Sequence, residues 1–249
     1  MADWRLEVLG EARLLRRAEP LPLQRRAAAV LAYLALEGPT PKYRLAGLLW
    51  PDSTEDTARN NMRQLLRRLR VSTGEALVTG RETISLASQV ATDVGELRTH
   101  SFAGRYAQAL AVGGTLLGTL DFDDCPDFEA WLSRARERLE ALRRHAASAE
   151  SDAREQAGDL AGALSFAERL LALDPLSEEA YQRLMRLHYL AGDRMAALRR
   201  FESCRKILQE EFDAAPHPGT LALARDVERG QVCPLPSRKP EPVLLRSML

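Results

Sequence analysis

The stretch that decides the fold is residues 54–70, which run Thr-Glu-Asp-Thr-Ala-Arg-Asn-Asn-Met-Arg-Gln-Leu-Leu-Arg-Arg-Leu-Arg. Apolar residues recur three or four positions apart, which places them along one side of an α-helix. Arg, Asn and Gln collect on the opposite side, and these side chains read guanine and adenine and also bind phosphate. The pattern predicts a helix that enters a DNA groove, although a solvated basic face would look the same. The predicted DNA-facing residues are Arg59, Asn60, Arg63, Gln64, Arg67, Arg68 and Arg70.

Two predicted helices precede this basic helix. Residues 24–37 carry Ala, Val and Leu at helical spacing and end at Gly38-Pro39, a strong helix stop. Residues 42–49 follow one proline and end just before another. Two helices joined by a short turn, the second of them basic, are typical of a helix-turn-helix motif. Weaker phosphate contacts are expected from Arg25, Arg26, Lys42 and Arg44.

Short strands are predicted on both sides of these helices. Residues 4–10 alternate as a strand does, and residues 12–15 are expected to pair with them. Residues 77–79 and 83–86, separated by a turn at residues 80–82, are typical of a hairpin. Strands, three helices and a closing hairpin predict a winged helix, with the hairpin as the wing. Thr79 and Arg81 would then be wing contacts to DNA.

An internal repeat appears in the Ala-, Leu-, Arg- and Glu-rich remainder of the chain. Residues 157–164 match residues 191–198 at five of eight positions, at an offset of 34 residues, which is the tetratricopeptide period. Gly would end one helix, Asp would cap the next, and Ala would let paired helices approach closely. The helices expected in this part are residues 91–100, 103–117, 128–156, 159–173, 177–190, 193–212 and 218–229.

Two smaller features of this part also carry predictions. Gly113-Gly114 stands in a predicted helix and indicates a close helix crossing. The acidic residues at 121–127 lack the glycine and terminal glutamate of a calcium loop, which favours a solvated turn. The predicted fold is mainly α, with a winged-helix DNA-binding domain at 1–90, a tetratricopeptide-like domain at 91–230 and a mobile Pro-rich tail at 231–249.

Together these motifs resemble the SARP-type transcriptional activators. The resemblance rests on Leu6 to Gly10, Leu23 to Arg26, Arg44 to Trp50, Ala58 to Asn61 and Arg67 to Arg70. It implies a response-regulator-type winged helix followed by an all-helical bacterial transcriptional activator domain. By position, Asn60, Arg63, Gln64 and Arg67 correspond to the DNA-facing side of the recognition helix. The resemblance further implies binding to direct repeats near promoters, often as a pair of protomers, and recruitment of RNA polymerase through its sigma and alpha subunits.

Charge and cysteine content agree with an intracellular regulator. The net charge is zero, but residues 1–90 hold 14 basic against 10 acidic residues, and the rest holds 21 against 25. A basic head and an acidic body suit a protein that places one end on DNA. Cys125, Cys204 and Cys233 lie too far apart for a zinc motif, so reduced thiols are expected. No apolar run of about 18 residues indicates a membrane span, and a cytoplasmic protein is expected.

The sequence favours a binding protein over an enzyme. His100, His145, His188 and His217 have no carboxylate or cysteine at metal-ligand spacing, and no phosphate-binding Gly-rich loop is present. We therefore expect no catalytic residues, metal or cofactor. The alternative function is a tetratricopeptide-type protein-interaction adaptor without specific DNA binding, because concave repeat surfaces bind peptides.

Overall fold

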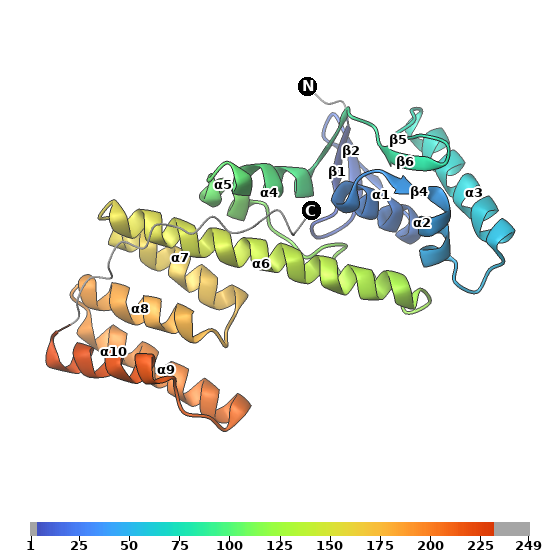
Figure 1. The fold of residues 1–249 in the computed structure, drawn as a ribbon. Coiled ribbons are helices and arrows are strands. Elements are labelled where there is room, and N and C mark those ends of the chain that lie inside the picture. The colour runs from blue at the N-terminus through green and yellow to red at the C-terminus, as the bar shows by residue number, and fades with distance from the viewer. Residues whose placement is uncertain (1–3, 232–249) are drawn as a thin grey trace. The chain divides into compact units, whose positions relative to one another are not determined.

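The chain forms two compact units, one reaching to Leu139 and the other beginning at Glu140. The computed structural model describes residues 4–231. The first unit contains a small sheet, a hairpin and helices, and the described residues of the second are all in helices or the turns between them (Figure 1). The predicted fold class, a mainly α chain with an N-terminal winged helix followed by a helical repeat unit, is confirmed.

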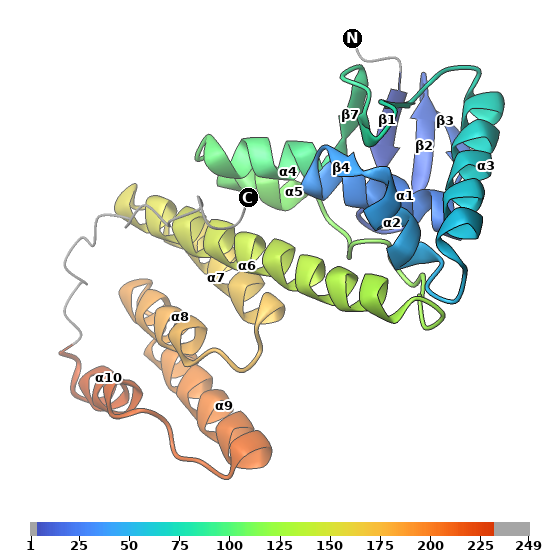
Figure 2. The same cartoon turned by 45° about the vertical axis from the view of Figure 1, so that its right-hand side comes forward.

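A four-stranded sheet opens the first unit. It contains β1 (Trp4–Glu7), β2 (Arg13–Arg16), β3 (Glu19–Pro22) and β7 (Val90–Thr92), in the order β3-β2-β1-β7 (Figure 2). The predicted pairing of the first two strands is confirmed as antiparallel. Sequence analysis missed β3, whose two prolines suit only the edge that the strand occupies. It also missed β7, which pairs in parallel with β1.

The predicted helix-turn-helix and wing are confirmed. The helices are α1 (Arg25–Glu37), α2 (Lys42–Leu49) and α3 (Glu55–Thr73). The wing consists of β5 (Val78–Thr79) and β6 (Thr83–Leu86), and β6 also pairs with the two-residue strand β4 (Thr40–Pro41) that precedes α2. Residues 27–34 of α1 are all buried, so this helix forms the centre of the winged-helix core.

Two helix predictions after the wing differ from the structure, the first by two residues at each end and the second by most of its length. The first, residues 91–100, is α4 (Asp93–Phe102), because residues 91 and 92 complete the sheet as part of β7. The second, residues 103–117, shrinks to α5 (Tyr106–Ala111). Gly114 has a φ of 100°, and a Cβ on it would lie 2.6 Å from the carbonyl carbon of Leu9. The Gly113-Gly114 pair therefore allows a loop to pass tightly against the end of the sheet and is not a helix crossing.

The remaining helices lie close to their predicted positions. They are α6 (Pro126–Gln156), which contains the boundary between the units, α7 (Leu160–Leu173), α8 (Glu178–Leu190), α9 (Arg194–Phe212) and α10 (Pro218–Arg229). Gly158 and Gly192, at matching repeat positions, both have positive φ. Asp159 and Asp193 then cap α7 and α9, accepting the amides of residues 162 and 196 at 2.9 and 2.8 Å. The small core residues Ala163 and Ala167 pack with Leu184 and Leu187.

The two compact units divide the chain after Leu139, whereas the predicted domains divide it after residue 90. The predicted boundary at residue 90 falls within β7, a strand of the winged-helix sheet, and the first unit continues into α6. The domain boundary at residue 90 stays a prediction. The predicted tail falls almost wholly at residues 232–249, outside the described residues.

Candidate nucleic-acid interface

The position of α3 follows from its cap and its apolar stripe. The hydroxyl of Thr54 accepts the amide of Thr57 at 3.4 Å, and two acidic residues occupy the first turn, where the helix dipole favours them. Ala58, Met62 and Leu69 are buried, while Leu65 and Leu66 are half-buried. This inward stripe fixes the rotation of the helix, so the side that faces solvent is the side that the sequence predicted.

Every predicted residue of the recognition helix is exposed. Arg59 forms an ion pair with Glu55 one turn earlier in the same helix. The four arginines further along have no ion pair or hydrogen bond from their side chains to any described residue. Within a row of like charges that has no acidic neighbours, only water and salt reduce the mutual repulsion. Such a row therefore favours binding of an external polyanion. The exposed residues of this face are Arg59, Asn60, Arg63, Gln64, Arg67, Arg68 and Arg70.

Arginines elsewhere in the described residues are mostly paired. In the second unit, Arg186 is buried and forms an ion pair with Glu155, and Arg183 pairs with Asp152. In the first unit, Arg138 pairs with Glu37, whose pKa is lowered because the bonds from Arg138 and Trp131 outweigh the opposing effect of burial. Against this background, the unpaired arginines of α3 concentrate positive charge on one helix.

The start of α2 and the turn of the wing lie next to each other. The amide of Lys42 donates to the carbonyl of Glu82 at 2.7 Å. Gly80 has a φ of 103°, and a Cβ there would lie 1.9 Å from the carbonyl oxygen of Thr83, so only glycine fits this turn. Lys42 is half-buried, whereas Arg44, Thr79 and Arg81 are exposed. None of the three cations, Lys42, Arg44 or Arg81, has an ion pair to a described residue.

Arg25 and Arg26 have a different environment, because both contact the acidic turn after α5. Arg25 donates to Asp124 at 2.6 Å and to the carbonyl of Asp121 at 3.0 Å, and Arg26 donates to Asp124 at 2.9 Å. The bond from Arg25 holds the pKa of Asp124 below its ordinary value. The prediction of a merely solvated turn is therefore wrong at Asp124. These two arginines already have a partner, which weakens their predicted role in phosphate binding.

Aromatic rings extend this contact. The guanidinium of Arg25 lies 5.2 Å from the ring centroid of Phe122, and that of Arg26 lies 5.3 Å from that of Trp50. The Cys125 thiol donates to the carbonyl of Leu49 at 3.3 Å. Sequence reasoning missed the contact of Arg25 and Arg26 with Asp124, because these partners lie about 100 residues apart and share no motif. The spacing of acidic and aromatic residues in the turn was the only available signal.

Two further properties of residues 4–231 bear on the kind of site. This part of the chain contains no group of three or more His, Cys, Asp or Glu side chains placed to hold a metal ion. Its helices are all too short or too polar to cross a membrane. Cys125 and Cys204 are free and buried, as predicted for reduced thiols, and burial raises the pKa of Cys204 to about 11.

The sheet, the three helices and the wing, followed by a helical repeat unit, define a winged-helix regulator architecture. The model of the bacterial transcriptional activator domain matches residues 84–228. The chain therefore belongs to the bacterial transcriptional activator domain family and is a transcriptional regulator of the SARP type. The family match begins within β6, so the family domain and the winged helix share sequence.

A solved structure has the same fold. The Mycobacterium tuberculosis protein EmbR, solved in complex with a low-affinity phosphopeptide, matches with a TM-score of 0.66 and 21% sequence identity. The match covers 94% of this chain and 67% of the EmbR chain. At this identity the likeness concerns the fold alone. No curated protein matches the chain.

Proposed function

We propose that this regulator binds double-stranded DNA sequence-specifically, with α3 in the major groove, and that it activates transcription. The observation that carries the proposal is the row of exposed, unpaired arginines on α3, interleaved with Asn60 and Gln64. Backbone phosphates supply the negative charge that this row lacks, and base edges supply the acceptors that it reads. A helix-turn-helix places this second helix in the groove.

The residues of the interface divide by what they would contact. Arg63 and Arg67 lie one turn apart in the middle of the exposed face and are the proposed guanine readers. Asn60 and Gln64 on the same face are the proposed adenine readers. The flanking cations and the wing are the proposed phosphate contacts, which set affinity and register without reading sequence. This second set comprises Arg59, Arg68, Arg70, Lys42, Arg44, Thr79 and Arg81, with Arg25 and Arg26 as weaker members.

The proposed partners follow from the family resemblance. We propose that the helical repeat unit contacts the sigma and alpha subunits of RNA polymerase. We further propose that the protein is cytoplasmic and that pairs of protomers bind direct repeats in promoter DNA. Stacked helix pairs provide the extended surface that such a contact requires. Abortive transcription with purified polymerase, using the chain with and without residues 140–249, measures whether that half adds activation.

Selection of bound fragments from a random DNA pool tests the DNA proposal. The proposal predicts enrichment of a repeated motif that the protein binds far more tightly than a scrambled control. Arg63→Ala and Arg67→Ala should each lose part of that preference. No enrichment, or equal weak binding to both sequences, would contradict sequence-specific binding and favour the protein-interaction adaptor.

A further inference from the structure

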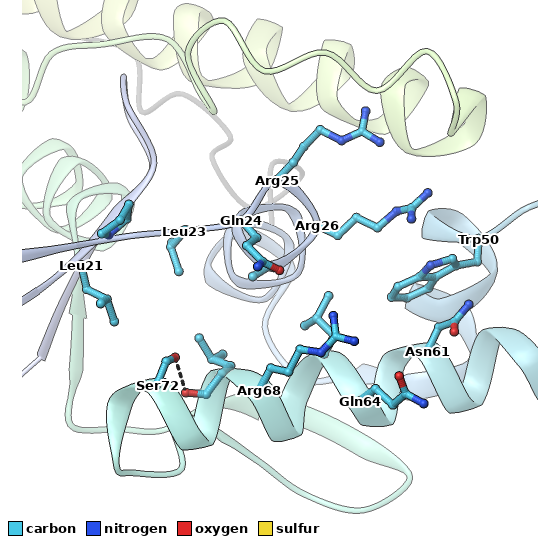
Figure 3. A pocket seen from close by; sticks show the side chains of 14 residues that line it. Leu21, Leu23, Gln24, Arg25, Arg26, Trp50, Asn61, Gln64, Arg68 and Ser72 are labelled. Atoms are coloured by element: carbon cyan, nitrogen blue, oxygen red, sulfur yellow. Dashed lines mark hydrogen bonds between the residues drawn. The ribbon is translucent and has the colours of Figure 1, made fainter.

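A groove runs beside α3, between that helix and the segment that leads from β3 into α1 (Figure 3). Its volume is about 640 Å³, within the range of sites for small organic ligands. Leu21 and Leu23 line one side, with the indole of Trp50 at one end. Leu65 of α3 also lines the groove. The groove therefore offers an apolar wall and one aromatic face.

The polar lining of this groove carries positive charge and no carboxylate. Arg25, Arg26 and Arg68 line it, together with the amide side chains of Asn61, Gln64 and Gln24. Arg68 has no ion pair to any described residue. The Nε atom of Arg26 is buried and has no hydrogen-bond partner among the described residues. That atom has almost no accessible surface, so a ligand in the groove would not reach it, and Arg25 and Arg26 already pair with Asp124. The positive charge that is available to an anion in the groove is therefore that of Arg68.

The backbone contributes in the same direction. Gln24 is the N-cap of α1 but makes no capping hydrogen bond with its side chain, and no acidic residue occupies the first turn. Residues 24–27 all line the groove. The free amides and the positive end of the 13-residue helix therefore lie at a cavity that already contains an unpaired arginine.

We propose that this groove binds a small organic anion. Its flat apolar body would lie against Trp50 and Leu65, and its carboxylate, sulfonate or phosphate group would lie between Arg68 and the start of α1. The apolar wall favours such a ligand over a DNA phosphodiester, which has no apolar part to bury there. The inference stands on the groove itself and does not require DNA binding.

One consequence does rest on the proposed DNA-binding function. Gln64 and Arg68 line the groove and also belong to the proposed DNA-facing surface of α3. A ligand that engages Arg68 removes that cation from DNA, so the anion and the operator should compete. The groove would then be an effector site that lowers DNA affinity when it is occupied.

Fluorescence titration of the full chain with 8-anilinonaphthalene-1-sulfonate, in the absence of DNA, tests the site. This probe combines a sulfonate with an aromatic body. We expect saturable binding, weakened about tenfold or more by Arg68→Gln, because a charge-assisted hydrogen bond is lost. Gln24→Glu should weaken it as well, since it places a negative charge in the groove. An acidic residue at this position also suits the helix start, so misfolding would not explain the loss.

Two matched controls make the result interpretable. Arg70→Gln removes an exposed, unpaired arginine of the same helix that does not line the groove, and Gln108→Glu adds the same charge on α5. Both should bind the probe as the unchanged chain does. Equal affinity of Arg68→Gln and Gln24→Glu with the controls, or a signal that never saturates, would overturn the site. Neither result bears on DNA binding, which is measured without the probe.

Discussion

At the scale of single residues, acidic partners distinguish the arginines of this chain. Glu55 neutralises Arg59, and Asp124 binds both Arg25 and Arg26. Arg63 and Arg67 have no such partner among the described residues, although both are exposed. Surface ion pairs contribute little to stability, so the missing pairs cost the fold little. They leave the guanidinium groups available to the base edges that we propose they read.

Replacing the proposed base readers should change specificity more than stability. Arg63→Ala and Arg67→Ala should each cost about 1–3 kcal/mol of DNA binding and relax preference at one base position. Both side chains are exposed, so the free energy of unfolding should stay within about 0.5 kcal/mol of its original value. Binding to the selected motif and to its single-base variants measures both effects. Arg134 of α6 is exposed and has no ion pair to a described residue, so Arg134→Ala is the matched control. If it weakens binding as much, the assignment of α3 is wrong.

Asp93 is a buried carboxylate that holds the end of the first strand. Its Oδ2 accepts the amides of Val8 and Leu9, both at 2.8 Å, and its Oδ1 accepts the amide of Val94 at 2.7 Å. Burial raises its pKa, while these three bonds oppose the shift. Asp93→Ala would leave three buried amides without a partner, at a cost of about 3 kcal/mol or more. Urea unfolding measures this loss, and Asp93→Asn, which keeps one oxygen acceptor, should lose less. A loss equal to that of an exposed Asp→Ala change would contradict this role.

The buried thiols should resist modification. Burial raises the pKa of Cys204 to about 11 from an ordinary value of 9.0, and burial also raises that of Cys125. Since the thiolate is the reactive form, a Cys233→Ser chain should take up almost no Ellman's reagent at pH 8 until it is unfolded. Raising the pH from about 9 to 11 should lower the free energy of unfolding, because the unfolded Cys204 thiol ionises first. Rapid reaction of the native chain at pH 8 would contradict the buried environment.

At the scale of elements, the wing depends on one backbone conformation. Gly80→Ala combines a positive φ with a Cβ that would overlap the carbonyl of Thr83. We expect a loss of about 1 kcal/mol or more of stability and weaker DNA binding, because Thr79 and Arg81 would move. Thermal unfolding and DNA titration measure the two effects. Gly47→Ala in α2 meets no atom within 4 Å and is the control; it should be neutral or slightly stabilising. Unchanged stability of Gly80→Ala would contradict the account of this turn.

Elements with a strong local signal were predicted from sequence almost to the residue. The second helix, bounded by prolines, was predicted at the residues that α2 occupies, and capping by Asp159 and Asp193 was anticipated from the repeat. The errors arose where distant contacts decide the structure. Residues 90–92 form a strand only because β1 lies beside them. The loop at Gly114 is shaped by the backbone of Leu9, which no local pattern in the sequence encodes.

The candidate site follows the same rule. The exposed face of α3 was predictable because burial of a single apolar stripe fixes the rotation of the helix about its axis. The pairing of Arg25 and Arg26 with Asp124 was not, and neither was the groove beside Trp50. Both depend on segments that the fold brings together from separate parts of the sequence.

At the scale of the whole molecule, the net charge is zero, but basic residues are in excess in the N-terminal part and acidic residues in the remainder. The winged-helix part carries the excess of basic residues, and its unpaired cations lie on α3, α2 and the wing. The second unit pairs buried arginines with carboxylates between helices, as Arg186 does with Glu155. A polyanion should therefore engage the first unit with little help from net charge. Binding should depend steeply on salt even though the chain as a whole is neutral.

The salt dependence of DNA affinity tests the central claim most directly. Each phosphate neutralised releases counterions and adds about −0.9 to the slope of log affinity against log salt concentration. With seven unpaired cations on the proposed interface, we predict a slope of about −3 to −6 on the selected motif. Arg70→Gln, a proposed phosphate contact, should make that slope shallower by about 1, whereas Arg134→Ala should leave it unchanged. A slope near zero, or one that Arg134→Ala alters as much as Arg70→Gln, would contradict DNA binding through this surface.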